Sequence, residues 1–201
     1  MADPGASASL ETDRLFLRPF TADDVDNLVA LDSDAAVMRF INGGRPTPRE
    51  EVAGKVLPRF LWYQEQPHGY GFWAVEEKAT GAFIGWFHLR PDPDGGDPAE
   101  PELGYRLIRE TWGRGFATEG SRALIARAFT ELGARRVWAA TMVLNVSSRR
   151  VMEKAGMRQV RTFWGEWPEK IPGDEHGDVE YAITREEWEA ADSKSASRAA
   201  R

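Results

Sequence analysis

Three small residues stand directly before an amphipathic helix in the stretch ETWGRGFATEGSRALIARAF, which runs from Glu110 to Phe129. They are Gly113, Gly115 and Ala117. The first backbone N–H groups of a helix have no partner within it, and the helix dipole adds positive potential there. Phosphate binds readily at such a helix start where glycine lets the backbone come close. A plain tight turn between a strand and a helix would use the same residues, so the stretch alone leaves both interpretations open.

Two familiar phosphate-binding patterns do not match this stretch. The segment GRGFAT lacks the last glycine of the dinucleotide pattern G-x-G-x-x-G, and no clear strand–helix–strand unit with an acidic ribose-binding residue accompanies it. No Gly-Lys-Ser/Thr occurs in the chain, which excludes the triphosphate loop. What remains is a strand, a loop of small residues, a helix, a strand, and a second helix that Asn145 can cap at NVSSRR.

The elements around these motifs predict a mixed α/β chain with one sheet. Alternating apolar residues predict a first strand in DRLFLRPF, followed by a hairpin in GFWAVEEKATGAFIGWFHLRP that turns at Thr80 and Gly81. Two further strands are predicted in ELGYRLIRE and RRVWAATMV. A final strand pair is predicted in MRQVRTFWGEW and DVEYAITREEW. Helical spacing predicts helices in TADDVDNLVALDSD and in TPREEVAGKVLPRFLWYQEQ, which Pro58 should kink or break. The segment DAAVMRFINGG is expected to connect these two helices.

Length and composition limit the class of protein. The 201 residues suit one domain over 10–189, with a tail at 1–9 and another at 190–201 that we expect to be disordered. There is no cysteine, which fits a reducing compartment, and we expect a cytoplasmic protein. No stretch approaches the roughly 20 apolar residues of a membrane span. A net charge of −6 and a pI near 5.2 argue against a nucleic-acid binder.

The stretches ELGYRLIRETWGRGFATEG and NVSSRRVMEKAGM together resemble the coenzyme-A site of the GNAT superfamily of N-acetyltransferases, in its ribosomal-protein N-acetyltransferase-like (Rim-type) branch. The resemblance covers nearly the whole domain, from ETDRLFLRPF to DVEYAITREEW. The family signature of Gln or Arg, two residues, Gly, one residue, and Gly or Ala falls on Trp112, Gly115 and Ala117. Trp112 departs from it, which matters little because the loop acts through main-chain N–H groups. The resemblance implies a GNAT fold, with one mixed sheet of about six to seven strands and helices on both faces.

The resemblance also implies where acetyl-CoA would bind. The end of the ELGYRL strand, at Leu107 and Ile108, would pair with the pantetheine arm as an added strand would. Asn145 would hold a pantetheine amide. The loop 112–118 would cradle the pyrophosphate, and it consists of Trp112, Gly113, Arg114, Gly115, Phe116, Ala117 and Thr118.

Acetylation of an amine requires that the amine lose a proton, that the oxyanion be stabilised and that the leaving thiolate be neutralised. Glu102, at the start of its strand, is the candidate base, directly or through water; a solvated carboxylate at a strand end is the alternative. Ser148 matches the family serine that donates to the thiolate, with a helix-capping serine as the alternative. Tyr105 is a further candidate donor, although a strand tyrosine next to apolar neighbours often only packs.

The remaining histidines and tryptophans are assigned mainly structural roles. His68, His88 and His176 show no ligand spacing, so we expect no metal. His88 lies in a strand of the hairpin and could face the cleft, but we interpret it as a hydrogen-bonded histidine of the sheet. Four tryptophans are expected in the core: Trp62, Trp73, Trp86 and Trp138.

In the family that the chain resembles, the polar loop 165–178 closes over the acceptor site, as does the connection 34–44, so both are expected to border that site. Its carboxylates outnumber its single Lys170, and Trp164 and Trp167 lie at its start. If these carboxylates face the site, they attract a cationic amine, so the sequence predicts a net-positive acceptor and a rate that falls with ionic strength. A solvated acidic turn is the alternative. The acidic residues are Glu166, Glu169, Asp174, Glu175 and Asp178.

These observations predict an enzyme that moves an acetyl group from acetyl-CoA to a primary amine by direct attack in a ternary complex, without a covalent enzyme intermediate. The acceptor is a protein N-terminus or a small-molecule amine, and no nucleic acid or membrane is involved. A homodimer is allowed for. The alternative from another class is a non-catalytic acyl-CoA-binding or regulatory module with the same fold. The sequence does not identify the acceptor, the acyl chain length or the oligomeric state.

Overall fold

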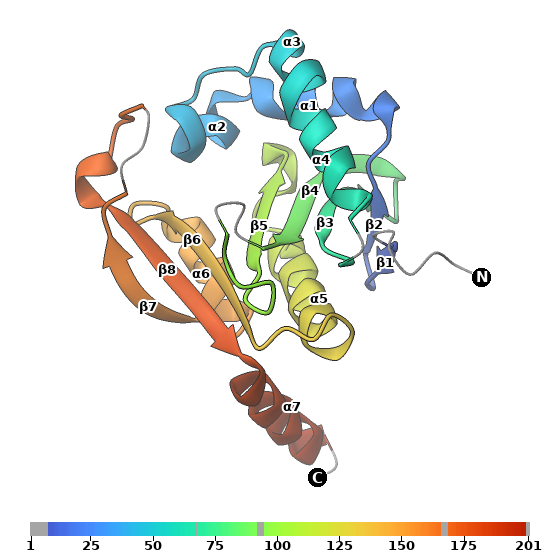
Figure 1. Cartoon of the computed structure of the whole chain (residues 1–201), viewed down its shortest axis with the longest axis vertical. Helices are drawn as coiled ribbons and strands as arrows, with labels where there is room; N and C mark the ends of the chain where they lie inside the picture. Colours follow the sequence, from blue (N-terminus) through green and yellow to red (C-terminus); the bar gives the residue numbers. More distant parts are fainter. Residues whose placement is uncertain (1–7, 67, 92–94, 166–168, 200–201) are drawn as a thin grey trace.

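One eight-stranded sheet forms the centre of the molecule (Figure 1). The computed structural model describes residues 8–66, 68–91, 95–165 and 169–199. The strand order is β1-β2-β3-β4-β5-β6-β8-β7, and all neighbours are antiparallel except β5 and β6, which are parallel. The predicted single mixed sheet is confirmed, with the two-residue β1 as the strand that was not expected. The strands are β1 (Leu10–Glu11), β2 (Leu15–Pro19), β3 (Gly71–Glu77), β4 (Ala82–Arg90), β5 (Glu102–Leu107), β6 (Arg136–Met142), β7 (Arg158–Phe163) and β8 (Asp178–Thr184).

Helices cover both faces of the sheet, as predicted. Strand β3 shows why: Trp73 and Val75 pack into the core under α5 and α6, whereas Phe72 and Ala74 pack into the core with α1 and α4. The longer helices are α1 (Val25–Ser33), α2 (Ala35–Asn42), α4 (Leu57–Gln64), α5 (Phe116–Thr130), α6 (Val146–Lys154) and α7 (Arg185–Ala199). The shorter ones are η1 (Ala22–Asp24), α3 (Arg49–Glu51), η2 (Val52–Val56), η3 (Arg109–Thr111) and η4 (Asp174–His176). No helix in the described part of the chain is long and apolar enough to cross a membrane.

Helix α5 lies unusually close to the sheet at Gly120. A Cβ atom built on Gly120 would lie 2.4 Å from Cζ of Phe87 on β4. Because Phe87 is fully buried, its ring has nowhere to move. The absence of a side chain at Gly120 therefore fixes how deeply α5 docks, and with it the position of the small-residue loop in front of the helix.

Strands β5 and β6 are paired at a single register position, Glu102 with Trp138. Before that point the two segments are tied by main-chain bonds, from Arg135 N–H to Ala99 O (2.7 Å) and from Trp138 N–H to Pro101 O (3.1 Å). After it, both strands line a cleft. The sheet is thus closed at one end of this pair and open at the other.

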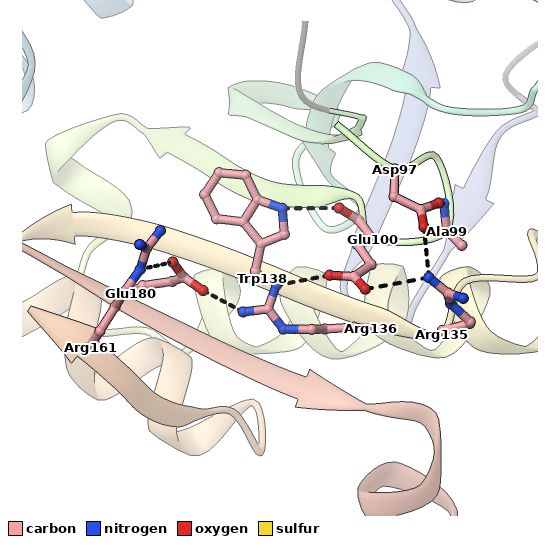
Figure 2. A network of polar contacts seen from close by, with 8 residues as sticks. All are labelled: Asp97, Ala99, Glu100, Arg135, Arg136, Trp138, Arg161 and Glu180. Atoms are coloured by element: carbon pink, nitrogen blue, oxygen red, sulfur yellow. Dashed lines mark hydrogen bonds and ion pairs between the residues drawn. The ribbon is translucent and has the colours of Figure 1, made fainter. Parts of the chain in front are cut away.

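A network of charged side chains reinforces the closed end (Figure 2). Arg136 of β6 pairs with the buried Glu180 of β8 and with Glu100, just before β5 (Nη1 to Oε2, 3.3 Å). Arg161 of β7 holds the second oxygen of Glu180 at 2.7 Å. Arg135 joins Glu100 to Asp97. The network therefore links three strands to the segment that enters β5.

Two helical segments differ from the prediction. Pro58 distorts its helix but does not break it: the preceding turn widens into the π-helical η2, in which Leu57 N–H donates to Val52 O, and Pro58 then stands in the first turn of α4. The predicted connection 34–44 is wrong, since it forms α2. Asp34 caps α2 by accepting from Ala36 N–H at 2.8 Å, and no glycine or proline in the sequence marks the break from α1.

The chain ends also differ from the predicted tails. Residues 1–7 lie outside the described residues, but the Ala8 carbonyl is anchored, accepting from Trp73 Nε1 (3.1 Å) and Arg127 Nη1 (2.8 Å). The segment 190–199 continues α7 and is helical in the structure.

We expect Gly120→Ala to destabilise the protein although alanine favours helices by about 1 kcal/mol over glycine. The new methyl group overlaps the Phe87 ring, and overpacking of a core costs about 1–3 kcal/mol. Thermal unfolding measures the effect. The matched control is Gly54→Ala in the exposed π turn, where a Cβ meets nothing within 4 Å, and a Gly120→Ala protein as stable as this control would contradict the close docking of α5.

Candidate functional site

A cleft of about 780 Å³ opens where β5 and β6 part. Its walls come from the C-terminal parts of these two strands, the start of α5, the start of α6 and part of α2. It brings together eleven of the residues that the sequence singles out: Glu102, Tyr105, Leu107, Trp112, Gly113, Gly115, Phe116, Ala117, Thr118, Asn145 and Ser148. Ile108 and Arg114 do not line it. Ile108 packs against both cores, and the Arg114 guanidinium pairs with Glu77.

The small-residue loop forms one end of this cleft. Gly113 and Gly115 have φ of +75° and +85°, a backbone conformation that residues other than glycine rarely adopt. Gly115 is the N-cap of α5. The indole Nε1 of Trp112 donates to Leu107 O at 2.9 Å. The loop therefore presents the unpaired N–H groups at the start of a 15-residue helix, which is an arrangement that suits an anion.

Arg14, in the turn between β1 and β2, holds this loop from outside. Arg14 donates through Nη1 to Arg114 O (2.9 Å) and through Nε to the Glu119 carboxylate in the first turn of α5 (2.7 Å). Burial would raise the pKa of Glu119, but hydrogen bonds from Thr12 and Arg14 outweigh it and lower that pKa. The carboxylate is therefore ionised near neutral pH, where it also complements the helix dipole.

Two hydroxyl groups meet further along the cleft. The Tyr105 hydroxyl lies 3.4 Å from Ser148 Oγ, and burial raises the pKa of Tyr105, which keeps its proton available for donation. Asn145 caps α6, accepting from Ser148 N–H at 3.2 Å and donating through Nδ2 to Thr141 Oγ1 at 3.0 Å. The cap is thus the asparagine side chain, and the serine hydroxyl faces the tyrosine.

Glu102 lies at the junction of β5 with its neighbours. Its carboxylate pairs with Arg90 Nη2 at 2.6 Å and approaches His88 Nε2 at 3.6 Å. Burial favours the neutral acid, but the contact with His88 and the positive charges of Arg90 and Arg59 outweigh it, so the pKa of Glu102 lies below its ordinary value. Glu102 is therefore a carboxylate at neutral pH, able to accept a proton.

His88 differs from the prediction of a hydrogen-bonded sheet histidine. Its side chain is 9 % exposed, and neither ring nitrogen has a hydrogen-bond partner among the described residues, because 3.6 Å to Glu102 is too long. Burial lowers the pKa of His88, so the ring is neutral at pH 7. Gly104 faces it across the strand pair, and a Cβ there would lie 2.5 Å from the ring. Only the strand register, which the sequence did not supply, reveals this arrangement.

A second, smaller cavity of about 290 Å³ adjoins the cleft. The two share Ile41, Trp86, His88 and Arg106 in their walls. The smaller cavity is further lined by residues of α1, α4 and β4 that sequence reasoning missed, among them Asp32, Arg59 and Arg90. A charged residue on a helix or strand gives no signal in sequence that it faces inward rather than solvent.

The acidic loop does not face either cavity. Glu169 pairs with Arg45, Asp174 accepts from Ile171 N–H (2.7 Å) and Glu175 accepts from Gly173 N–H (3.2 Å). None of the described residues of 165–178 lines the cleft or the smaller cavity, which removes the stated reason for a net-positive acceptor. Glu166 and Trp167 lie outside the described residues.

The tryptophans divide between core and surface. Trp73 and Trp86 are buried in the core, as expected. Trp138 is only half-buried and belongs to neither core cluster, and Trp62 is 54 % exposed, so the assignment of these two to the core is wrong. Trp164 is 68 % exposed. Among the described residues, no three side chains of the metal-binding types gather as a metal site would require.

Comparisons with known proteins give one consistent result. Residues 14–158 match the family described as acetyltransferase (GNAT) domain. The chain is 36 % identical over 188 residues to the FsC-acetyl coenzyme A-N(2)-transacetylase of Aspergillus fumigatus, covering 91 % of this chain and 79 % of that protein. It is 35 % identical over 89 residues to a protein of Bacillus subtilis named putative ribosomal N-acetyltransferase YdaF, covering 44 % and 47 % of the two chains. A solved ribosomal-protein alpha-N-acetyltransferase (RimL) in complex with coenzyme A superposes with a TM-score of 0.71 at 20 % identity, covering 88 % of this chain and 97 % of that one.

We expect Gly115→Val to abolish binding of acetyl-CoA, because a β-branched side chain is strained at φ +85° and blocks the approach of phosphate to the helix start. Calorimetric titration measures the affinity. The matched control is Gly81→Val in the β3–β4 turn, which has φ +69° and nothing within 4 Å of its Cβ, and which therefore pays a similar backbone cost far from the cleft. Equal affinity in the two variants would remove the loop from the coenzyme site.

Proposed function

Because the chain belongs to the GNAT acetyltransferase family and is an acetyl-CoA-dependent N-acetyltransferase, we propose that it transfers the acetyl group directly to a primary amine that enters from the smaller cavity. One observation carries this proposal. The Glu102 carboxylate and the Tyr105–Ser148 hydroxyl pair line the same cleft, and Glu102 contacts residues of the smaller cavity that adjoins it.

In this proposal acetyl-CoA lies along the cleft, with its pyrophosphate on the loop 112–118. The pantetheine arm follows β5 towards Ser148, and Asn145 still has one amide hydrogen available for it. Leu107 and Phe116, both buried, give this part of the cleft apolar walls. Arg114 then contributes only through its main-chain N–H, since its side chain pairs with Glu77 and its carbonyl accepts from Arg14. Ile108 does not contribute, because its N–H donates to Ile84 O and its carbonyl accepts from Thr111.

The transfer itself proceeds by attack within the ternary complex. Glu102 takes a proton from the ammonium form of the acceptor, directly or through one water, because only the neutral amine is nucleophilic. The nitrogen then attacks the thioester carbonyl carbon, and a C–N bond forms as the C–S bond breaks. The Ser148–Tyr105 pair delivers a proton to the leaving thiolate, while the nitrogen releases its second proton to solvent. The chain has no cysteine to carry the acetyl group, which agrees with direct attack.

The acceptor can be a small-molecule amine or a peptide N-terminus, and a non-catalytic acyl-CoA-binding module remains the rival from another class. Release of free coenzyme-A thiol in the presence of an amine panel separates these. Thiol release with small amines alone identifies a small-molecule acetyltransferase, and release with peptides identifies an enzyme that acts on peptide N-termini. Binding of acetyl-CoA without thiol release identifies a non-catalytic module.

Ser148→Ala should lower kcat by roughly 10- to 10⁴-fold while KM changes little, because the hydroxyl acts on a charge that develops only during the reaction. Its melting temperature should stay unchanged, since the α6 cap is Asn145 and the Ser148 N–H that it binds is retained. The comparison variant Asn145→Ala should lose about 0.5–2 kcal/mol of stability. Wild-type turnover in Ser148→Ala would return the serine to a structural role.

Glu102→Gln should lower kcat/KM by about 10²- to 10⁴-fold at neutral pH, because the proton acceptor is lost. In the wild type, protonation of Glu102 should lower the rate only at a pH below the ordinary glutamate pKa, because the pKa of Glu102 is lowered in the folded protein. Arg90→Met removes a charge that holds this pKa down, so it should move that fall to higher pH. Rate profiles over pH measure both effects, and an unchanged profile in both variants would rule out Glu102 as the base.

A further inference from the structure

A guanidinium group without a carboxylate partner lies on the wall of the smaller cavity. Arg59, in the first turn of α4 after the π turn, has no carboxylate oxygen within 4.0 Å and no hydrogen bond among the described residues. Arg59 is exposed and lines the cavity, so its guanidinium is accessible to a ligand there. Burial by its surroundings lowers the pKa of Arg59, and the nearby charges of Arg90 and Arg106 add to that shift. A cation in such a place favours an anion.

The other charges around the cavity are mostly neutralised within the protein. Arg106 pairs with the buried Asp32, and Arg90 pairs with Glu102. Glu51, on the exposed turn before η2, is a further carboxylate of the wall and does not pair with Arg59. Two of the three guanidinium groups therefore serve to fix carboxylates, and the third remains available.

The Arg59 side chain is held in place by aromatic rings. Its guanidinium carbon lies 5.9 Å from the Phe60 ring centre and 5.8 Å from that of Phe72. Both rings are buried, and they stack on each other at 3.9 Å. Cation–π contact with these two rings orients the guanidinium before any ligand binds, and this reduces the conformational entropy lost on binding.

A second observation points to a ligand in the same cavity. The buried His88 is one of its lining residues, and neither ring nitrogen of His88 has a hydrogen-bond partner among the described residues. A buried polar atom without a partner costs free energy, and a ligand that hydrogen-bonds to it removes that cost. His88 also stands beside Glu102, so a group bound to it is next to the proposed base.

We propose that the smaller cavity is a subsite for a carboxylate of the acceptor, held by Arg59, while the acceptor amine lies near His88 and Glu102. The substrate class is a small primary amine that also carries an acid group, in other words an amino acid. A volume of about 290 Å³ suits a molecule of that size. The proposal rests on the proposed acetyl transfer, and it replaces the net-positive acceptor that the acidic loop led us to expect.

The test uses the series of ω-amino acids from glycine to 6-aminohexanoate, each beside its carboxamide, as acceptors in a thiol-release assay. The wild type should prefer one acid over its amide by about 10- to 100-fold, as expected for a charge-assisted pair. Arg59→Met should lose this preference, and Arg59→Lys should retain part of it. The control Arg49→Met removes the same charge from an exposed arginine that pairs with Asp26 outside the cavity, and it should behave as the wild type.

The possible failures can be told apart. Transfer to amides and acids at equal rates in the wild type, or an acid preference that survives in Arg59→Met, overturns the carboxylate subsite and leaves acetyl transfer standing. If no amine releases thiol, the proposed function fails, and binding of the same acids by the protein is then measured by calorimetry. Binding that is lost in Arg59→Met but not in Arg49→Met would still support the subsite, whereas no binding in the wild type would overturn it. Acetyl-CoA affinity and melting temperature confirm that each variant is folded.

Discussion

Strands β5 and β6 run in the same direction and are hydrogen-bonded only at their beginnings, around Glu102 and Trp138. From there the strand edges separate and leave main-chain N–H and C=O groups that the sheet does not use. An extended ligand can bind such an edge as another strand would. The charged network at the closed end, which joins Glu100 and Glu180 to arginines of β6 and β7, resists further separation (Figure 2). This separation of β5 and β6 determines the width of the cleft. It also determines the distance between the glycine loop and Ser148 and the place where the cleft meets the smaller cavity.

The electrostatics of the site are local and differ from those of the whole chain. The chain carries a net charge of −6, yet the smaller cavity is walled by three arginines. Two of them pair with Asp32 and Glu102, and Arg90 is one of the groups that lower the pKa of the proposed base. Net charge therefore says little about which substrate a protein of this kind accepts. What matters is which charged groups remain unpaired where the cavity walls exclude water.

The sequence predicted most strands, the hairpin turn at Gly81, the glycine loop and the helix cap at Asn145, because each depends on residues close together in the chain. It failed where the answer depends on distant residues. The free ring nitrogens of His88 follow from its register opposite Gly104, and the inward position of Arg59 follows from the docking of α4 on β3. Helix α2 was missed because Asp34 both ends α1 and begins α2. The residues proposed to bind the coenzyme carry a local pattern, whereas those proposed to recognise the acceptor are assembled by the fold.

The contacts of Arg14 and Thr12 with Glu119 and with the Arg114 carbonyl join positions about a hundred residues apart. Closing so long a loop of chain has an entropic cost, and local contacts at the start of α5 do not offset that cost by themselves. An excised peptide with the glycine loop and α5 would therefore form some helix without holding the loop in shape. The shape of the loop therefore depends on the segment between β1 and β2 as well as on its own residues. The state of the glycine loop in this sense reports on whether the start of the chain is docked on the sheet.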